Sequence, residues 1–411
     1  MPAGTSPPRS RMSSHFTEPV SVRSTRVSKS YSGAGVTAHT SHIVVVERLA
    51  PSIVRRSLSV RGRTIILMRE APLISFVVPC YNSAEYMRRG IDSILLDGGE
   101  VREHIEIILV NDGSTDDTEQ IAREYEERHP EIVRVVSQEN GGHGAAVMAG
   151  VRAAVGTYLK VLDSDDRLDA RALTALLDAV ASFPPDNRPD VVLTDYVYDN
   201  HALKKNRRIG YRRTVPARRT VTWDQVSRPR MGSYFLMHAI LYKRSVLLES
   251  GLELPRHTFY VDNLYASIPL RHTHTLYYLP VPLYYYFIGR EDQSVNEKIM
   301  ISRLDQQLRV NRIMIDELRV ENIASRSLRR YLLHYLTIIT SVSLTFAVLA
   351  KTPEAKAKGR DLLAYLKAHN YPAYRAYRRT PMSIGLSARG PGAHRFIRTT
   401  YGVIRKRFGF N

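Results

Sequence analysis

Between residues 73 and 197 the chain alternates short apolar runs with stretches of helical spacing, and this alternation restricts the fold more than any other feature. The apolar runs cover residues 73–79 (LISFVVP), 105–110 (IEIILV), 133–136, 158–162 (YLKVL) and 190–197 (DVVLTDYV). The helical stretches between them cover residues 86–96, 116–128, 145–154 and 168–183. Strands that alternate with helices at this spacing predict a parallel, doubly wound α/β sheet. The loops after its strands then lie at one edge, where such sheets bind ligands.

The formal net charge of +19 is concentrated at the two ends of the chain. Residues 1–67 hold ten Lys or Arg against two acids, and residues 371–411 hold nine Lys or Arg and no acid. The part between them carries only about +2, which argues against a fold that grips nucleic acid in its body. Residues 1–67 are also rich in Ser, Thr, Pro and Arg, and this composition predicts disorder. The same composition is also typical of a transit peptide. Alternatively, translation begins at Met68 and residues 1–67 are not translated.

After residue 200 the sequence pattern is less regular. A basic stretch at 201–222 is typical of a loop, and apolar segments follow at 234–242 and 284–287. Residues 301–367 have helical character, and the uncharged run 331–350 is about long enough to span a bilayer. Polar residues at spacings of three and four give that run one polar face, which favours a helix packed on protein. The single cysteine, Cys80, excludes an intramolecular disulfide and suits a reducing cytosol.

The strongest chemical signal is the acidic cluster Asp163-Ser164-Asp165-Asp166 at the end of an apolar run. Like charges this close are costly unless a cation neutralises them, and carboxylate oxygens suit Mg²⁺ or Mn²⁺. Such an ion would bridge the diphosphate of a nucleotide sugar and stabilise charge on the departing nucleotide. The alternative is an acidic turn that caps the next helix.

Three further groups of residues follow other strands. After the first strand, Tyr81 could stack on a nucleobase or simply pack. After the second, Asp112 could accept hydrogen bonds from a base or ribose, although turn chemistry alone explains the motif equally well. The glycine-rich stretch 140–144 (NGGHG) could present backbone N–H groups to a phosphate or serve only as a flexible turn. It is not GxGxxG, which disfavours a nicotinamide enzyme.

Four stretches in this order and spacing resemble family 2 glycosyltransferases of the GT-A fold: ISFVVPCYN, ILVNDGSTDDT, QENGGHGAAVMAG and YLKVLDSDD. The resemblance covers about residues 73–200 closely and reaches loosely to about 300. It implies a GT-A, Rossmann-like, mostly parallel sheet flanked by helices, with a C-terminal helical region and a disordered N-terminus. The expected organisation is an extension (1–67), a glycosyltransferase domain (68–300) and a helical region with a basic tail (301–411). Within the domain, residues 73–170 would form the nucleotide-sugar half and 171–300 the acceptor half.

The resemblance also assigns roles to residues of this chain. Tyr81 and Asp112 would contact the nucleotide base, with Pro79 shaping that pocket. Asp163 would approach the ribose or the metal, and Asp165 would bind Mn²⁺ or Mg²⁺ directly. A loop that closes over the diphosphate would carry Arg290, Gln293 and Ser294.

Members of the family invert the anomeric centre, so a general base must deprotonate the acceptor hydroxyl. They carry that base in a Glu-Asp pair near the start of a helix, and the nearest match here is Val261-Asp262. The Glu position is therefore a valine. We expect Asp262 to be the catalytic base, since a carboxylate among aromatic residues has a raised pKa. The alternatives are that Asp262 caps a helix or pairs with Arg271, and His238 is interpreted as structural.

The predicted activity is transfer of a sugar from a nucleotide diphosphate sugar, with UDP more expected than GDP, to a glycan or lipid-linked acceptor in cell-surface polysaccharide synthesis. The predicted location is cytoplasmic, at the inner face of the cell membrane. There the basic, aromatic residues 394–410 would contact anionic lipid. One alternative is a sugar nucleotidyltransferase, which would need a Gly-rich basic loop after the first strand. The other is a polyanion-binding protein, which would leave the acidic cluster unexplained.

Overall fold

The computed structural model describes residues 45–50, 53–60, 63–95, 104–200, 205–288, 297–380 and 383. Within these ranges a ten-stranded sheet forms the centre of the molecule. Its strands are β4 (Ile74–Cys80), β5 (Ile105–Asn111), β6 (Val133–Ser137), β7 (Tyr158–Val161), β8 (Arg167–Leu168), β9 (Val191–Asn200), β10 (Lys205–Ile209), β11 (Thr220–Thr222), β12 (Ile240–Lys243) and β13 (Thr275–Ile288). The strand order is β11-β13-β9-β12-β7-β4-β5-β6, with β10 paired to β9 and β8 paired to β13.

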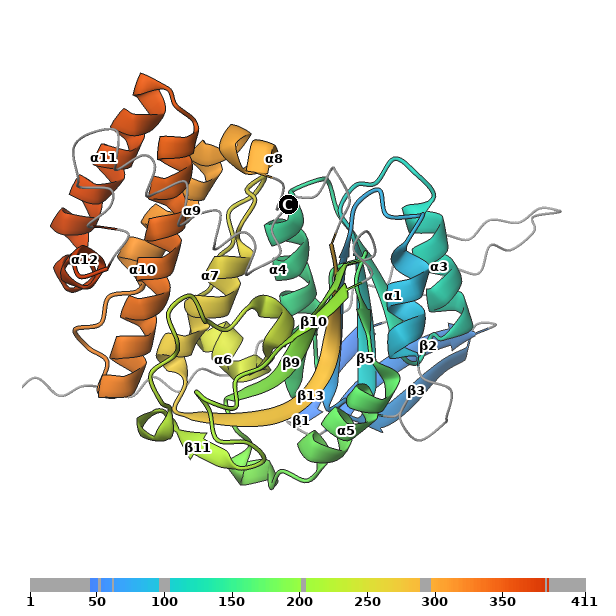
Figure 1. The fold of residues 1–411 in the computed structure, drawn as a ribbon. Helices are drawn as coiled ribbons and strands as arrows, with labels where there is room; N and C mark the ends of the chain where they lie inside the picture. The colour runs from blue at the N-terminus through green and yellow to red at the C-terminus, as the bar shows by residue number, and fades with distance from the viewer. Residues whose placement is uncertain are drawn as a thin grey trace, which may run out of the picture.

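Helices cover both sides of this sheet, and others form a separate group beside it (Figure 1). They are α1 (Met87–Ile94), α3 (Thr118–Arg128), α4 (His143–Ala153), α5 (Ala170–Ala181), α6 (Arg244–Glu249), α7 (Asp262–Ser267), α8 (Glu297–Ser302), α9 (Leu304–Glu317), α10 (Arg326–Leu349), α11 (Pro353–His369) and α12 (Tyr371–Arg378). Beside β5, α1 and α3 lie on one side of the sheet and α4 on the other (Figure 1). All residues of β4 and β5 are therefore buried, as their continuous apolar runs predict.

The predicted α/β sheet with flanking helices is confirmed, and it is mostly parallel. Strands β4, β5, β6 and β7 pair in parallel, and so do β9 and β13. The antiparallel strands are the short strands β8, β10 and β11 and, within the sheet, β12, which lies between β7 and β9. Its apolar sequence indicated a buried segment, but neither the neighbours nor the direction of a four-residue strand can be taken from periodicity.

Three antiparallel strands precede the central sheet: β1 (Val45–Ala50), β2 (Ile53–Val60) and β3 (Arg63–Glu70). They fall largely within the stretch whose composition predicts disorder, and of residues 1–67 the structure describes only 45–50, 53–60 and 63–67. The β-branched residues in each strand favour pairing. The surrounding Arg and Ser residues dominate the composition and hide this local preference.

Helix α10 contains an 18-residue window with a mean hydropathy of 1.8 and is the one helix among the described residues long and apolar enough to cross a membrane. In this structure 61% of its apolar window is buried against protein. It contacts α9, α11 and α12, and these helices form a group at one side of the molecule (Figure 1). Its polar residues bond within the chain, as in the pairs Gln307–Ser343 (3.1 Å) and Asn311–Thr340 (3.3 Å). These contacts support the interpretation of a packed helix.

Candidate functional site

The carboxyl ends of β4, β5 and β7 bring three of the predicted motifs to one edge of the sheet. The loops after β4 and β5 are bonded directly, since Asn82 Oδ1 accepts the N–H of Thr115 at 2.8 Å. Pro79 is buried near the end of β4, whereas Tyr81, directly after the strand, is 51% exposed. An exposed ring of this size at a strand end is available for stacking, the role that the family resemblance implies for Tyr81.

Asp112 is buried at the end of β5, and its carboxylate already accepts three hydrogen bonds. The donors are the Gln138 side chain (2.6 Å) and the backbone N–H groups of Gly141 (2.9 Å) and Gly142 (2.7 Å). The glycine-rich turn therefore directs these two N–H groups at an internal carboxylate, which does not support its interpretation as a phosphate cradle. Asp112 shapes the turn that begins α4.

Gly142 allows a second loop to lie directly on this turn. Its φ is +81°, and a Cβ at this position would lie 3.0 Å from the backbone nitrogen of His257. The His257 N–H in turn donates to the Gly141 carbonyl at 2.7 Å. The loop that leads to Asp262 is thus fixed on the start of α4.

Replacing Gly142 with alanine is expected to lower the free energy of unfolding by about 2–4 kcal/mol, because left-handed strain adds to the clash with His257. Urea unfolding measures this loss. The matched control is Gly251→Ala, where φ is +62° but no atom lies within 4 Å of the new Cβ. That variant should lose only about 1 kcal/mol. Equal losses of unfolding free energy in the two variants would show that the close contact between Gly142 and His257 does not matter for stability.

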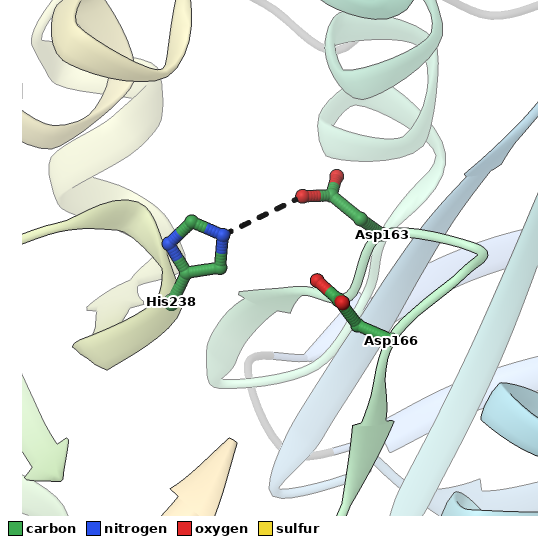
Figure 2. A group of neighbouring side chains, drawn as sticks. All are labelled: Asp163, Asp166 and His238. Atoms are coloured by element: carbon green, nitrogen blue, oxygen red, sulfur yellow. Dashed lines mark ion pairs between the residues drawn. The ribbon is translucent and has the colours of Figure 1, made fainter. Parts of the chain in front are cut away.

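Asp163 follows β7 and lies between two histidines. Its Oδ1 is 2.8 Å from His143 Nε2, and its Oδ2 is 3.7 Å from His238 Nε2 (Figure 2). Desolvation acts to raise the pKa of Asp163, but the charge and hydrogen bond of His143 outweigh it and lower that pKa. Asp163 is therefore a carboxylate in the folded protein.

His143, the first residue of α4, had no individual role in the sequence prediction. Burial acts to lower its pKa, but the charges of Asp163, Asp262 and Asp165 raise it overall. The neighbouring acids thus favour the protonated form of His143. The glycine-rich motif pointed to this turn, but not to an imidazole directed at Asp163.

The other two acids of the cluster differ in their surroundings. Asp165 is partly buried, and its charge is felt by both Asp166 and His143. Asp166 is buried and accepts hydrogen bonds from the Tyr284 hydroxyl (2.5 Å) and the Phe287 N–H (2.7 Å). Burial and the charges of Asp165 and Asp163 raise the pKa of Asp166 well above its usual range. Asp166 therefore anchors β13 beneath the cluster.

Buried Lys160 on β7 fixes the segment that carries His238. Its Nζ donates to the backbone carbonyls of Met237 (3.3 Å), His238 (2.5 Å) and Ile240 (3.4 Å). Burial lowers the pKa of Lys160 to about 7, against the opposing charges of Asp163 and Asp166. No sequence pattern indicated this contact, since its partners lie 77 to 80 residues further along the chain.

The cluster has the donor atoms that a divalent metal ion requires. Asp163, Asp166 and His238 each offer one ligand atom, and these atoms all lie within 4.8 Å of one another. Both ring nitrogens of His238 are buried, and neither has a hydrogen-bond partner among the described residues. Carboxylate oxygens with an unsatisfied imidazole fit a metal site. The predicted ligand Asp165 is adjacent in sequence.

Asp262 begins α7 close to these groups. Burial and the charge of Asp163 raise its pKa to about 6, although the charge of His143 opposes the shift. The backbone before it is strained, with φ of +47° at His257 and +67° at Tyr260. Arg271, the alternative partner suggested by the sequence, instead pairs with Glu317 at 3.4 Å. The structure thus brings the predicted base and Asp163 within electrostatic reach of each other.

Three predicted donor-binding residues, Arg290, Gln293 and Ser294, lie outside the described residues, as does the basic segment 394–410. His238, interpreted from sequence as structural, is packed among tyrosines but also faces Asp163.

Comparisons with known proteins identify the same part of the chain. Residues 75–245 match the sequence model of glycosyl transferase family 2. A chondroitin synthase of Escherichia coli is 34% identical over 136 residues, which is 33% of this chain and 19% of that protein. An uncharacterized glycosyltransferase of Rickettsia prowazekii is 43% identical over 96 residues, or 23% of this chain and 28% of that protein. The match thus spans about a fifth to a quarter of the length of these relatives.

Solved structures support the fold. The crystal structure of S. aureus TarS 1-349 superimposes with a TM-score of 0.55 at 20% identity, covering 73% of this chain and 82% of that chain. The predicted GT-A fold is therefore confirmed.

Proposed function

Since this chain belongs to glycosyl transferase family 2, with the matching domain at residues 75–245, we propose that it transfers a sugar from a nucleotide diphosphate sugar to a hydroxyl group. The donor is a UDP-sugar, and the reaction inverts the anomeric centre. One observation carries the proposal. Asp262, 99 residues after Asp163, has a pKa raised to about 6 by burial and by the charge of that residue. A base and a donor-binding acid at one sheet edge are what transfer requires.

In the proposed mechanism the exposed ring of Tyr81 stacks on the base, and Pro79 forms the floor beneath it. Asp112 adds a contact to the base from the turn that it organises. Asp163 and Asp165 would hold Mn²⁺ or Mg²⁺, which when bound stabilises negative charge on the diphosphate. By the family resemblance, Arg290, Gln293 and Ser294, which lie outside the described residues, would contact the same diphosphate.

The chemical step is a single displacement. Asp262 accepts the proton of the acceptor hydroxyl as its oxygen bonds to the anomeric carbon. The bond from that carbon to the diphosphate oxygen breaks, and the nucleoside diphosphate leaves with both bonding electrons. A carboxylate with a pKa of about 6 is ionised at neutral pH and is basic enough to take the proton.

The pH dependence of kcat/KM tests this role. Asp262 acts only when ionised, and its raised pKa is about 6. We expect kcat/KM to be flat above pH 7 and to fall about tenfold per pH unit below pH 6. Initial rates between pH 4.5 and 8.5 measure the profile. A rate that stays constant down to pH 5 would contradict Asp262 as the base.

A donor screen tests the function itself. Thermal shift and hydrolysis should be measured with UDP- and GDP-sugars, each with Mn²⁺, with Mg²⁺ and with EDTA. The expected result is a shift with one or a few UDP-sugars that requires the metal. A shift with GDP-sugars alone would change the donor class, and no response to any nucleotide sugar would overturn the proposal.

The acceptor is a growing glycan or a lipid-linked sugar in polysaccharide synthesis. Support comes from the names of relatives that share the domain, a chondroitin synthase and a hyaluronan synthase, the latter from Pasteurella multocida at 35% identity over 133 residues. We place the reaction at the inner face of the cell membrane, with residues 394–410 in contact with anionic lipid. Flotation with and without residues 390–411 tests this contact.

A further inference from the structure

His238 is the middle residue of a short 3-10 turn, Met237–Ala239, and its ring faces Asp163. Its ring stacks on Tyr286, with ring centroids 4.4 Å apart, and packs edge-on against Tyr284 at 4.7 Å. Only 6% of the residue is exposed, and in the part of the chain that the structure describes neither ring nitrogen has a hydrogen-bond partner. Buried polar atoms in folded proteins nearly always have partners, so this imidazole lacks one that it should possess.

The direction of the ring identifies what is missing. In Figure 2 one ring nitrogen is directed at Asp163, and the separation from Nε2 to Oδ2 is 3.7 Å. This distance is too long for a hydrogen bond. Two atoms that each lie about 2.1 Å from one ion are about 3.0 Å apart at a right angle and about 4.2 Å apart when opposite. The observed separation falls inside that range.

We propose that His238 is a ligand of the divalent metal ion and shares it with Asp163 through Oδ2. The inference rests on the proposed function only in taking that metal as part of the site. Asp163 divides its two oxygens between two imidazoles, because Oδ1 already bonds His143 at 2.8 Å. Asp166 remains the anchor of β13, since its oxygens accept from Tyr284 and Phe287.

Lys160 makes His238 a rigid ligand. The lysine is fully buried and binds the carbonyl of His238 itself, as well as those of Met237 and Ile240. The two tyrosines fix the plane of the ring. A ligand held on both its backbone and its ring is positioned before the ion arrives.

A nitrogen ligand changes the choice of metal. Mg²⁺ favours sites built only from oxygen, whereas Mn²⁺ and Co²⁺ also accept imidazole. The site therefore binds Mn²⁺ more tightly than Mg²⁺. The substitution His238→Gln replaces the imidazole nitrogen with an amide oxygen and reduces the difference in affinity between the two ions.

Pulsed EPR of bound Mn²⁺ tests the proposal without any measurement of turnover. Full-length protein with Mn²⁺ and UDP should show hyperfine coupling to a directly bound ¹⁴N, and ¹⁵N-histidine labelling should change it to a ¹⁵N pattern. His238→Gln should lose the coupling and weaken Mn²⁺ binding about tenfold or more. His143→Gln is the matched control, because it removes the other imidazole on Asp163 and should keep the coupling.

Each outcome is decisive. Wild-type protein that binds Mn²⁺ without nitrogen coupling overturns the proposal even if His238→Gln does not fold. Coupling that survives in folded His238→Gln, or that disappears in His143→Gln alone, assigns the ligand to another residue and also overturns it. Nitrogen-coupled Mn²⁺ in a protein that turns over no nucleotide sugar would support the ligand and refute the proposed function. Sugar transfer by a protein whose bound Mn²⁺ shows no nitrogen coupling would support the proposed function and refute His238 as a ligand.

Discussion

Asp262→Asn is expected to reduce sugar transfer by about 10³- to 10⁴-fold while leaving the Kd for the donor within about twofold, because asparagine keeps the shape of the side chain but cannot accept the proton. Transfer is measured by release of the nucleoside diphosphate with acceptor present, and the donor Kd by calorimetry. Loss of donor binding together with transfer would contradict the role, since the base touches only the acceptor hydroxyl. The matched control is Asp305→Asn, which removes an exposed carboxylate paired with Lys358 and should change neither quantity.

The same variant should be more stable than the parent above pH 6. The folded-state pKa of about 6 exceeds the ordinary aspartate value of 3.8, so the folded protein retains a proton between these pH values that the unfolded chain releases. Stability therefore falls as pH rises through this window, and a neutral side chain avoids the loss. We expect a gain of about 1–2 kcal/mol at pH 8 and none at pH 4. Thermal unfolding at the two pH values measures it.

Asp165→Asn is expected to weaken metal-dependent donor binding by about 10²-fold or more, because the amide cannot supply the anionic oxygen that Mn²⁺ or Mg²⁺ requires. The Kd for the UDP-sugar identified in the screen should be measured with Mn²⁺ and with EDTA. In the parent the two values differ, and in the variant they should converge on the weaker one. A variant that still responds fully to Mn²⁺ would place the ion elsewhere.

Asp169→Asn is the matched control for that experiment. Asp169 lies four residues further along, where its side chain accepts the N–H of Ala172 at 2.9 Å and caps α5. Asparagine caps helices about as well as aspartate, so this variant should change neither stability nor donor binding appreciably. Together the two variants separate the acidic cluster from the capping role that the sequence alone could not exclude.

Much of the fold and part of the site could be predicted from the sequence. Buried parallel strands have continuous apolar runs, so β4, β5 and β7 were predicted within a residue or two of their bounds. The motifs at their ends meet because parallel strands end at one edge. Asp163 and Tyr81 could be identified for this reason.

The remaining contacts join residues that are distant in the chain, and local periodicity says nothing about them. Tyr284 reaches Asp166 across 118 residues, and Lys160 reaches the carbonyl of His238 across 78. No sequence pattern indicated that the Asp112 carboxylate accepts hydrogen bonds from the backbone N–H groups of the glycine-rich turn. Such pairs depend on which strands become neighbours, and an antiparallel strand as short as β12 carries no sequence signal for its place.

The position of β12 in the sheet also determines when the chain can fold during its synthesis. Because β12 bridges β7 and β9, the sheet cannot close until Lys243 has left the ribosome. Until then the nascent chain presents an unpaired edge on each of the two strands, and such edges recruit other chains. A fragment that stops before Ile240 would keep both edges open, so the amino-terminal half on its own should aggregate rather than persist as an independent module.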